Sequence, residues 1–212
     1  MNDIKNLLPF LKFAVFIFSF IIHEIAHGYA AKYCGDNTPE ENGRLSLNPI
    51  KHFDAIGSFI VPAVLLFTNS SAVIGWGKPV PVDFSKFENR SQHIFTAAAG
   101  IIANGVLAII GLILYYCTNQ FMTPEASLLT QSVCLFCFML LPMNIILMIF
   151  NMFPLCPMDG WVIVKGFSSK RRKLKELKIN PYILMVNLLI ILILLKYITP
   201  LLMVFVKSIT IL

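Results

Sequence analysis

Charged side chains are scarce in this chain. Only 13% of its 212 residues are Asp, Glu, Lys or Arg, whereas 57% are hydrophobic, and the mean hydropathy is +0.76. A soluble domain of this length does not need so many apolar residues, so the composition excludes an ordinary soluble protein. We therefore predict an all-α polytopic membrane protein.

The chain also lacks the cysteine pattern of a secreted disulfide scaffold. Its five cysteines lie mostly in apolar segments, and the C-x-x-C pair of Cys134 and Cys137 has no second pair that would complete a zinc ribbon. We interpret these two cysteines as small packing residues and not as a redox or metal pair. No small-residue cleavage site follows the first apolar run, so we expect that run to stay in the mature protein.

A nucleic-acid partner is not indicated, although the net charge is +6. Seven of the 17 Lys and Arg residues fall between Lys165 and Lys178, among long apolar runs. Such a basic loop is typical of a cytoplasmic segment that touches anionic lipid. We expect membrane lipid, and no nucleic acid, among the partners.

Four apolar stretches are long enough to cross a bilayer, which takes about 20 residues. By residue number they are about 7–31, 93–117, 128–150 and 182–205. The stretch 56–67 is shorter and has Pro62 at its centre, so we predict that it is re-entrant. Residues 44–47 alternate polar and apolar side chains, which predicts a short strand. There is no internal repeat and no separate soluble segment, so we predict a single domain over residues 1–212.

Three chemically costly side chains, His23, Glu24 and His27, lie inside the first apolar stretch. On a helix, His23 and His27 are about one turn apart and project from one face, with Glu24 beside them. Two neutral imidazoles and an adjacent carboxylate are typical of a catalytic zinc site, where the Glu takes a proton from a zinc-activated water. A chance H-E-x-x-H on a soluble surface helix, or a pair of core histidines, would give the same pattern. The apolar residues 16–22 directly upstream do not fit a solvated helix face.

A catalytic zinc usually takes three protein ligands, so His23 and His27 need a partner. Most of the 11 Asp and Glu residues lie in polar segments, where water can hydrate them. Asp159 instead follows two prolines in an apolar setting, where an ionised carboxylate is costly unless it is paired or binds a metal. We predict that Asp159 is the third ligand. The alternative is that it only caps a helix that begins at Gly160.

This ligand set constrains the membrane topology. His23 and His27 lie near the end of the first span, and Asp159 lies beyond the end of the third. One metal can bind all three only if both ends face the same side, and a full crossing by residues 56–67 would separate them by about a bilayer thickness. We therefore expect this stretch to enter and return. The basic loop then places the N-terminus outside and the metal within the bilayer, nearer the cytoplasmic face.

Two motifs on the predicted spans carry a resemblance to a known family. They are His23-Glu24-x-x-His27 and Asn151-x-x-Pro154-x-x-x-x-Asp159-Gly160. Together they resemble the site-2 protease family of intramembrane zinc metalloproteases, and residues 43–52 and 75–82 resemble its compact prokaryotic branch, without a PDZ or CBS domain. A further family motif lies near Ala99-Gly100, where the family usually has Pro after the Gly and Asn four residues after it. This chain has Ile101 in place of the Pro but keeps the Asn as Asn104.

The resemblance implies one Zn²⁺ per chain, bound by His23, His27 and Asp159, with Glu24 as the catalytic acid/base. It implies a metalloendopeptidase that cleaves transmembrane segments of other membrane proteins, in a prokaryotic plasma membrane. Asn151 could donate to the oxyanion or the substrate backbone, or it could cap the end of a helix. Asn104 could contact substrate or join two helices.

Two further functions remain as alternatives at this stage. The first is a zinc-binding transporter or sensor without proteolytic activity. The second is an inactive homologue that acts as a membrane adaptor.

Because an unwound substrate needs a partner for its backbone, we also expect the predicted strand at 44–47 to pair with it.

Overall fold

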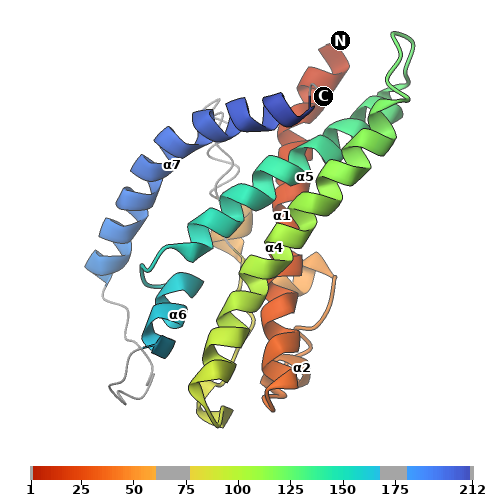
Figure 1. Ribbon diagram of the computed structural model, residues 1–212. Helices are drawn as coiled ribbons and strands as arrows, with labels where there is room; N and C mark the ends of the chain where they lie inside the picture. The colour runs from red at the N-terminus through yellow and green to blue at the C-terminus, as the bar shows by residue number, and fades with distance from the viewer. Residues whose placement is uncertain (1, 61–76, 168–180, 211–212) are drawn as a thin grey trace.

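The computed structural model describes residues 2–60, 77–167 and 181–210 (Figure 1). Within these ranges the chain is helical and contains no strand. The elements, in chain order, are α1 (Asn2–Tyr33), α2 (Thr38–Glu41), η1 (Pro49–His52), η2 (Ala55–Ile60), η3 (Phe84–Lys86), α4 (Arg90–Asn119), α5 (Leu128–Met152), α6 (Asp159–Phe167) and α7 (Pro181–Thr210). Helices α1, α4 and α5 pack against one another as the central bundle.

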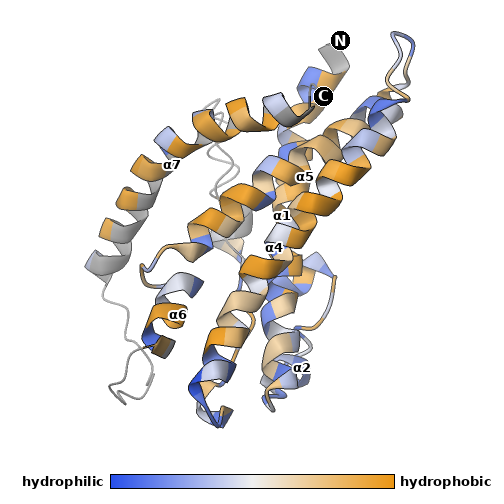
Figure 2. Cartoon of the chain, viewed as in Figure 1, coloured by the Kyte–Doolittle hydropathy of each residue, from blue (hydrophilic) through white to orange (hydrophobic). Residues whose placement is uncertain are grey.

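The three helices α1, α4 and α5 are each long and apolar enough to cross a membrane. They contain the predicted spans 7–31, 93–117 and 128–150. Figure 2 shows apolar residues along the middle of α4 and α5 and polar residues toward their ends, as expected for helices whose centres lie in hydrocarbon. The fourth predicted span, 182–205, lies in helix α7, and its crossing of the membrane stays a prediction.

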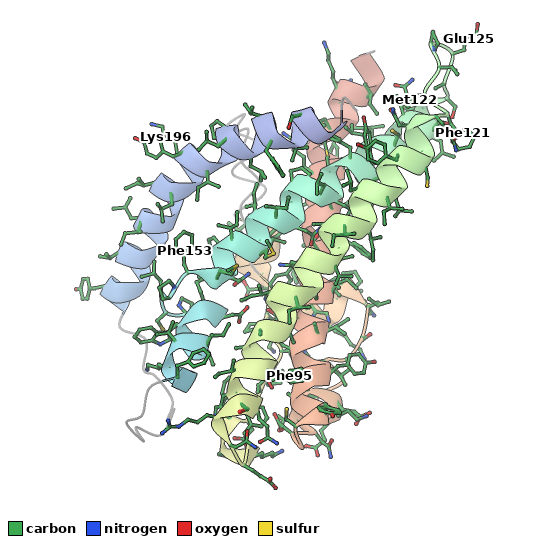
Figure 3. The ribbon with its side chains drawn as sticks, in the orientation of Figure 1. Phe95, Phe121, Met122, Glu125, Phe153 and Lys196 are labelled. Carbon is green, nitrogen blue, oxygen red and sulfur yellow. The ribbon has the colours of Figure 1, made fainter. Side chains whose placement is uncertain are left out.

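Local sequence signals set the ends of these helices. Asn89 and Gln92 form a capping box at the start of α4, in which each side chain accepts from the other residue's backbone N–H. Ser127 caps α5 through a hydrogen bond from the Thr130 N–H. The tight connection between α4 and α5 carries Glu125 at its tip, with Phe121 and Met122 below it (Figure 3).

Small and polar side chains hold the bundle together. A Cβ on Gly111 would lie 3.1 Å from the backbone nitrogen of Leu141, so α4 and α5 approach closely there. The Asn144 side-chain amide on α5 donates to Ser19 Oγ on α1 at 2.9 Å, and both residues are fully buried. Helix α7 packs on α5, and Leu202 and Val206 join a buried cluster there.

The segment between α1 and α4 begins and ends at the same end of the bundle. Tyr33 at the end of α1 and Phe95 near the start of α4 have ring centroids 6.0 Å apart. Helix α6 packs against α4 at this end (Figure 1). The ends of α1 and α5 therefore lie on one side, as the ligand set requires. The predicted re-entrant stretch 56–67 lies mostly outside the described residues, which include only helix η2 of it.

The predicted strand at residues 44–47 is wrong, because the structure leaves these residues irregular. The neighbouring extended segment contains Pro79 and Pro81, which have no N–H to give to a ladder. Arg44 does contact that segment, but through its guanidinium group instead of through backbone pairing. Of these four residues only Arg44 is buried, whereas Leu47 is 65% exposed, so the alternation of side chains does not correspond to a half-buried strand.

Candidate metal centre

The second half of α1 carries the H-E-x-x-H residues on its buried face. His23, Glu24 and His27 are only 5%, 8% and 9% exposed. One helical turn brings the two imidazoles together, so that their Nε2 atoms are 3.0 Å apart. The spacing predicted this arrangement, and the burial excludes a solvated helix face.

The break in the helix after α5 places Asp159 beside His23 and His27. Helix α5 ends at Met152, and α6 begins at Asp159 itself. A Cβ on Gly160 would lie 2.6 Å from the carbonyl oxygen of Phe153, so only glycine allows this tight return. Asp159 Oδ2 consequently lies 3.3 Å from the Nε2 atoms of both His23 and His27.

The three donor atoms have the geometry of a zinc site. They form a triangle with sides of 3.0, 3.3 and 3.3 Å. In a tetrahedral zinc site with bonds of about 2.0–2.1 Å, neighbouring donor atoms are about 3.3 Å apart. Asp159 Oδ2 is also buried without a hydrogen-bond partner among the described residues. Two imidazole nitrogens and one carboxylate oxygen therefore fit a zinc ion that retains an open fourth position.

Helix α4 provides a hydrogen-bond partner for the Nδ1 atom of each imidazole. His27 Nδ1 lies 2.7 Å from the Thr96 carbonyl oxygen, so Nδ1–H donates there and Nε2 is left for a metal. His23 Nδ1 lies 3.2 Å from the side-chain amide of Asn104, which is fully buried. Turning that amide by 180° places Oδ1, otherwise without a partner among the described residues, against the Nδ1–H of a metal-binding His23.

Gly100 allows α4 to lie directly against the ligands. A Cβ at this position would overlap His27 Nε2 and would lie 2.7 Å from His23 Nδ1. No side chain larger than hydrogen fits without moving one of the imidazoles. The sequence did not indicate that this glycine packs against the two histidines.

The carboxylate of Glu24 is held by a segment at residues 77–83, a contact that the sequence did not predict. The Val80 N–H donates to Glu24 Oε2 at 2.6 Å, and both residues are buried. Arg44, only 6% exposed, donates to the carbonyl oxygens of Lys78 and Pro79. Burial lowers the pKa of the Arg44 guanidinium, and the negative charge of Glu24 opposes that shift. The sequence Pro79-Val80-Pro81 could have indicated this contact, because it leaves a single N–H, that of Val80, between two prolines.

The remaining candidate residues are placed as follows. The Asn151 side chain donates to the Leu147 carbonyl one turn earlier, which satisfies a backbone group near the end of α5. An oxyanion role for Asn151 stays a prediction. Asn104 joins α4 to α1 at His23, and substrate contact by Asn104 likewise stays a prediction. Cys134 and Cys137 are buried and form no disulfide.

Comparison with known proteins identifies a peptidase family and relatives that are named as zinc metalloproteases. The profile of peptidase family M50 matches residues 119–194. Over 197 residues the chain is 30% identical to the Bacillus subtilis protein named "Putative zinc metalloprotease YwhC", an alignment that covers 92% of this chain and 83% of the relative. Over 153 residues it is 26% identical to "Putative zinc metalloprotease Rip2" of Mycolicibacterium smegmatis, which covers 71% of this chain and 54% of that relative. No solved structure matches.

The family profile includes Asp159, whereas both histidines lie outside its matched range. The longer alignment covers most of both proteins, and the structure brings Asp159 to His23 and His27. Sequence likeness and ligand geometry thus lead to one conclusion: the chain is a member of peptidase family M50, the site-2 protease family of zinc metalloproteases.

Proposed function

We propose that this protein is an intramembrane zinc metalloendopeptidase that hydrolyses peptide bonds within transmembrane segments of other membrane proteins. The observation that carries the proposal is the triangle of His23, His27 and Asp159 donor atoms, with Glu24 adjacent to it, in a bundle of apolar helices. A peptidase needs these groups at one point. A transporter would need ligands distributed along a path.

The chain's own residues supply most of the required chemistry. A zinc ion held by His23, His27 and Asp159 would supply a Lewis acid for the water and for the substrate carbonyl. Glu24 accepts the proton from that water and passes it to the leaving nitrogen. Because Val80 N–H occupies Oε2, we assign the proton transfer to Oε1. The buried histidines and Asp159 fix where the reaction occurs.

The cellular setting is part of the proposal. The basic residues between Lys165 and Lys178 support a cytoplasmic location for the loop after Asp159, and hence a metal nearer the cytoplasmic face. The bacterial relatives support a prokaryotic plasma membrane. The partners are then transmembrane protein substrates and lipid. A substrate helix must unwind to expose its scissile carbonyl, and residues 44–47 offer it no strand edge.

The test is zinc content and cleavage of a single-span substrate in proteoliposomes. Wild-type protein should hold one zinc per chain and cleave the substrate. Glu24→Gln should keep its zinc and lose at least about 100-fold in rate, the usual size of a general-base contribution. Asp159→Ala should lose zinc, while Glu125→Gln, at the exposed α4–α5 tip, should match the wild type.

Two results would overturn these assignments. Cleavage at the wild-type rate by zinc-loaded Glu24→Gln would remove Glu24 as the acid/base. Full zinc affinity in Asp159→Ala would disprove the ligand set.

A further inference from the structure

Residues 77–83 form an extended segment that is tied to three different parts of the fold. We refer to these residues as the strap. The Lys78 N–H donates to the His52 carbonyl at 2.9 Å, and the Asp83 N–H donates to Asp36 Oδ2 at 2.7 Å. Between these two anchors, the Val80 N–H donates to Glu24 Oε2. The strap therefore reaches the acid/base of the proposed peptidase through a backbone group.

One peptide group links Arg44 to Glu24. The carbonyl oxygen of Pro79 and the N–H of Val80 belong to the same planar unit, and a trans peptide directs them in opposite directions. Arg44 Nη2 donates to that oxygen at 3.1 Å, and the N–H donates to Glu24 Oε2 at 2.6 Å. A cation, a peptide dipole and an anion are thus aligned, an arrangement in which each hydrogen bond polarises the next.

The sequence around this peptide limits its alternatives. Pro79 and Pro81 have no N–H, so the strap offers Glu24 a single donor between them. The fixed φ of proline restricts rotation of the chain on both sides of Val80. Arg44 also donates to the Lys78 carbonyl, so its guanidinium holds two successive carbonyls. These features favour a rigid support over a loop that happens to lie nearby.

We propose that Arg44 is a positioning residue, which acts through the Pro79–Val80 peptide to hold Glu24 Oε2 and leave Oε1 directed at the reacting water. The inference rests on the proposed function, since it gives Glu24 an acid/base role. Arg44 touches neither substrate nor metal in this scheme. Its removal should therefore change the orientation of Glu24 and leave the zinc ligands in place.

The first test is hydrogen exchange at the Val80 amide in zinc-loaded protein, and it does not depend on activity. The flanking prolines make this amide easy to resolve, because residues 79–81 contain only this N–H. Arg44→Met should speed its exchange about tenfold or more, since a charge-assisted hydrogen bond loses its support. Glu24→Ala should do the same, and the double variant should add little. Unchanged exchange in Arg44→Met would overturn the proposal.

The second test separates kcat from KM with a single-span substrate. Arg44→Met should lower kcat about 10-fold to 100-fold, as expected for a displaced catalytic group, with KM and zinc content near wild type. Both bonds come from Arg44 Nη2, and a Lys ammonium ends about one bond short of that atom, so Arg44→Lys keeps the charge but should recover only part of kcat. Lys51→Met, which removes an exposed cation nearby, should behave as wild type.

The outcomes distinguish this proposal from the function on which it rests. A rise in KM at constant kcat, with slow Val80 exchange, would show that Arg44 supports substrate binding, and the proposal would be wrong. Absence of peptidase activity in the wild type would disprove the function. The exchange measurements would still decide whether Arg44 holds the peptide on Glu24. If Arg44→Met does not fold, Arg44→Lys provides the same comparison.

Discussion

The two functional halves of the centre are supported in different ways. His23, His27 and Asp159 are placed by helices, through the close approach of α4 at Gly100 and the sharp return into α6 at Gly160. Glu24 also lies on α1, but its carboxylate is held by a non-helical segment, through the Pro79–Val80 peptide that bonds to both Glu24 and Arg44. Helix packing is spread over many contacts, whereas the strap depends on individual donors. Substitutions should therefore separate metal binding from proton transfer.

The largest effect is expected from a substitution that disturbs the helix-supported group of His23, His27 and Asp159. Gly100→Ala would place a methyl group against His27 Nε2 and His23 Nδ1. One imidazole must then leave its position, so we expect zinc affinity to fall by more than about 100-fold, beyond the range of an indirect support. Competition with a chromogenic chelator measures this directly, and cleavage should disappear with the metal.

Gly105→Ala is the matched control on the same helix. Its added Cβ would lie 3.5 Å from Met148 Sδ, an ordinary contact. It should bind zinc as the wild type does. Equal zinc affinities for the two alanine variants would contradict the role given to Gly100.

An intermediate effect is expected at Asn104, which supports the same half through His23. Asn104→Leu removes the partner of His23 Nδ1 and should lower zinc affinity about 10-fold to 100-fold. Asn144→Leu removes an equally buried amide that contacts Ser19 and Leu140 instead. That control should weaken helix packing but keep zinc affinity. A comparable zinc loss in both variants would assign Asn104 a general packing role.

The smallest effect should come from the far anchor of the strap. Asp36→Asn weakens the bonds from the backbone N–H groups of Thr38 and Asp83 and the ion pair with Lys86. Loss of these charge-assisted bonds should cost about 1–3 kcal/mol of unfolding free energy and a few-fold in kcat, with zinc content unchanged. Denaturant unfolding in micelles measures the first quantity. Glu41→Gln, exposed nearby, is the control.

The same anchor gives a pH dependence with a definite sign. Burial alone would raise the pKa of the Asp36 carboxyl, but hydrogen bonds from Thr38 and Asp83 and contact with Lys86 outweigh it and lower the pKa below 3.8. The stabilisation is therefore complete above that pH and is lost as pH falls through the lower folded-state value. The stability gap between wild type and Asp36→Asn should be constant near neutrality and should shrink only below about pH 3.8. A gap that closes near pH 6 would exclude Asp36 as its source.

Sequence alone predicted that His23, His27 and Asp159 come together, because each has a strong local signal. Helical spacing joined His23 to His27, and an unpaired carboxylate in apolar surroundings identified Asp159. Apolar length located three of the predicted spans, which lie inside the longer helices α1, α4 and α5. These signals are local, or they depend on the cost of burying charge, and both can be read along the chain.

The hydrogen bonds that join Arg44, the strap and Glu24 were not predicted, because they depend on tertiary contacts between segments far apart in sequence. An alternation of four residues at 44–47 suggested a strand, but a strand needs a partner with free N–H groups, and the prolines at 79 and 81 remove them. The sequence offered interhelical contact as one role for Asn104, and the structure shows it, but the sequence did not predict His23 as the partner. That contact depends on the packing of α4 against α1, with Gly100 beside the two histidines.

The return of α6 at Gly160 has a consequence for the molecule as a whole. A metal bound by His27 and Asp159 would act as a cross-link that closes a loop of more than half the chain. Closing so long a loop restricts the unfolded ensemble strongly, as a disulfide between distant cysteines does. The cofactor would then also fasten the end of α5 to α1, and the bundle would owe part of its resistance to unfolding to the same ion that it holds for chemistry.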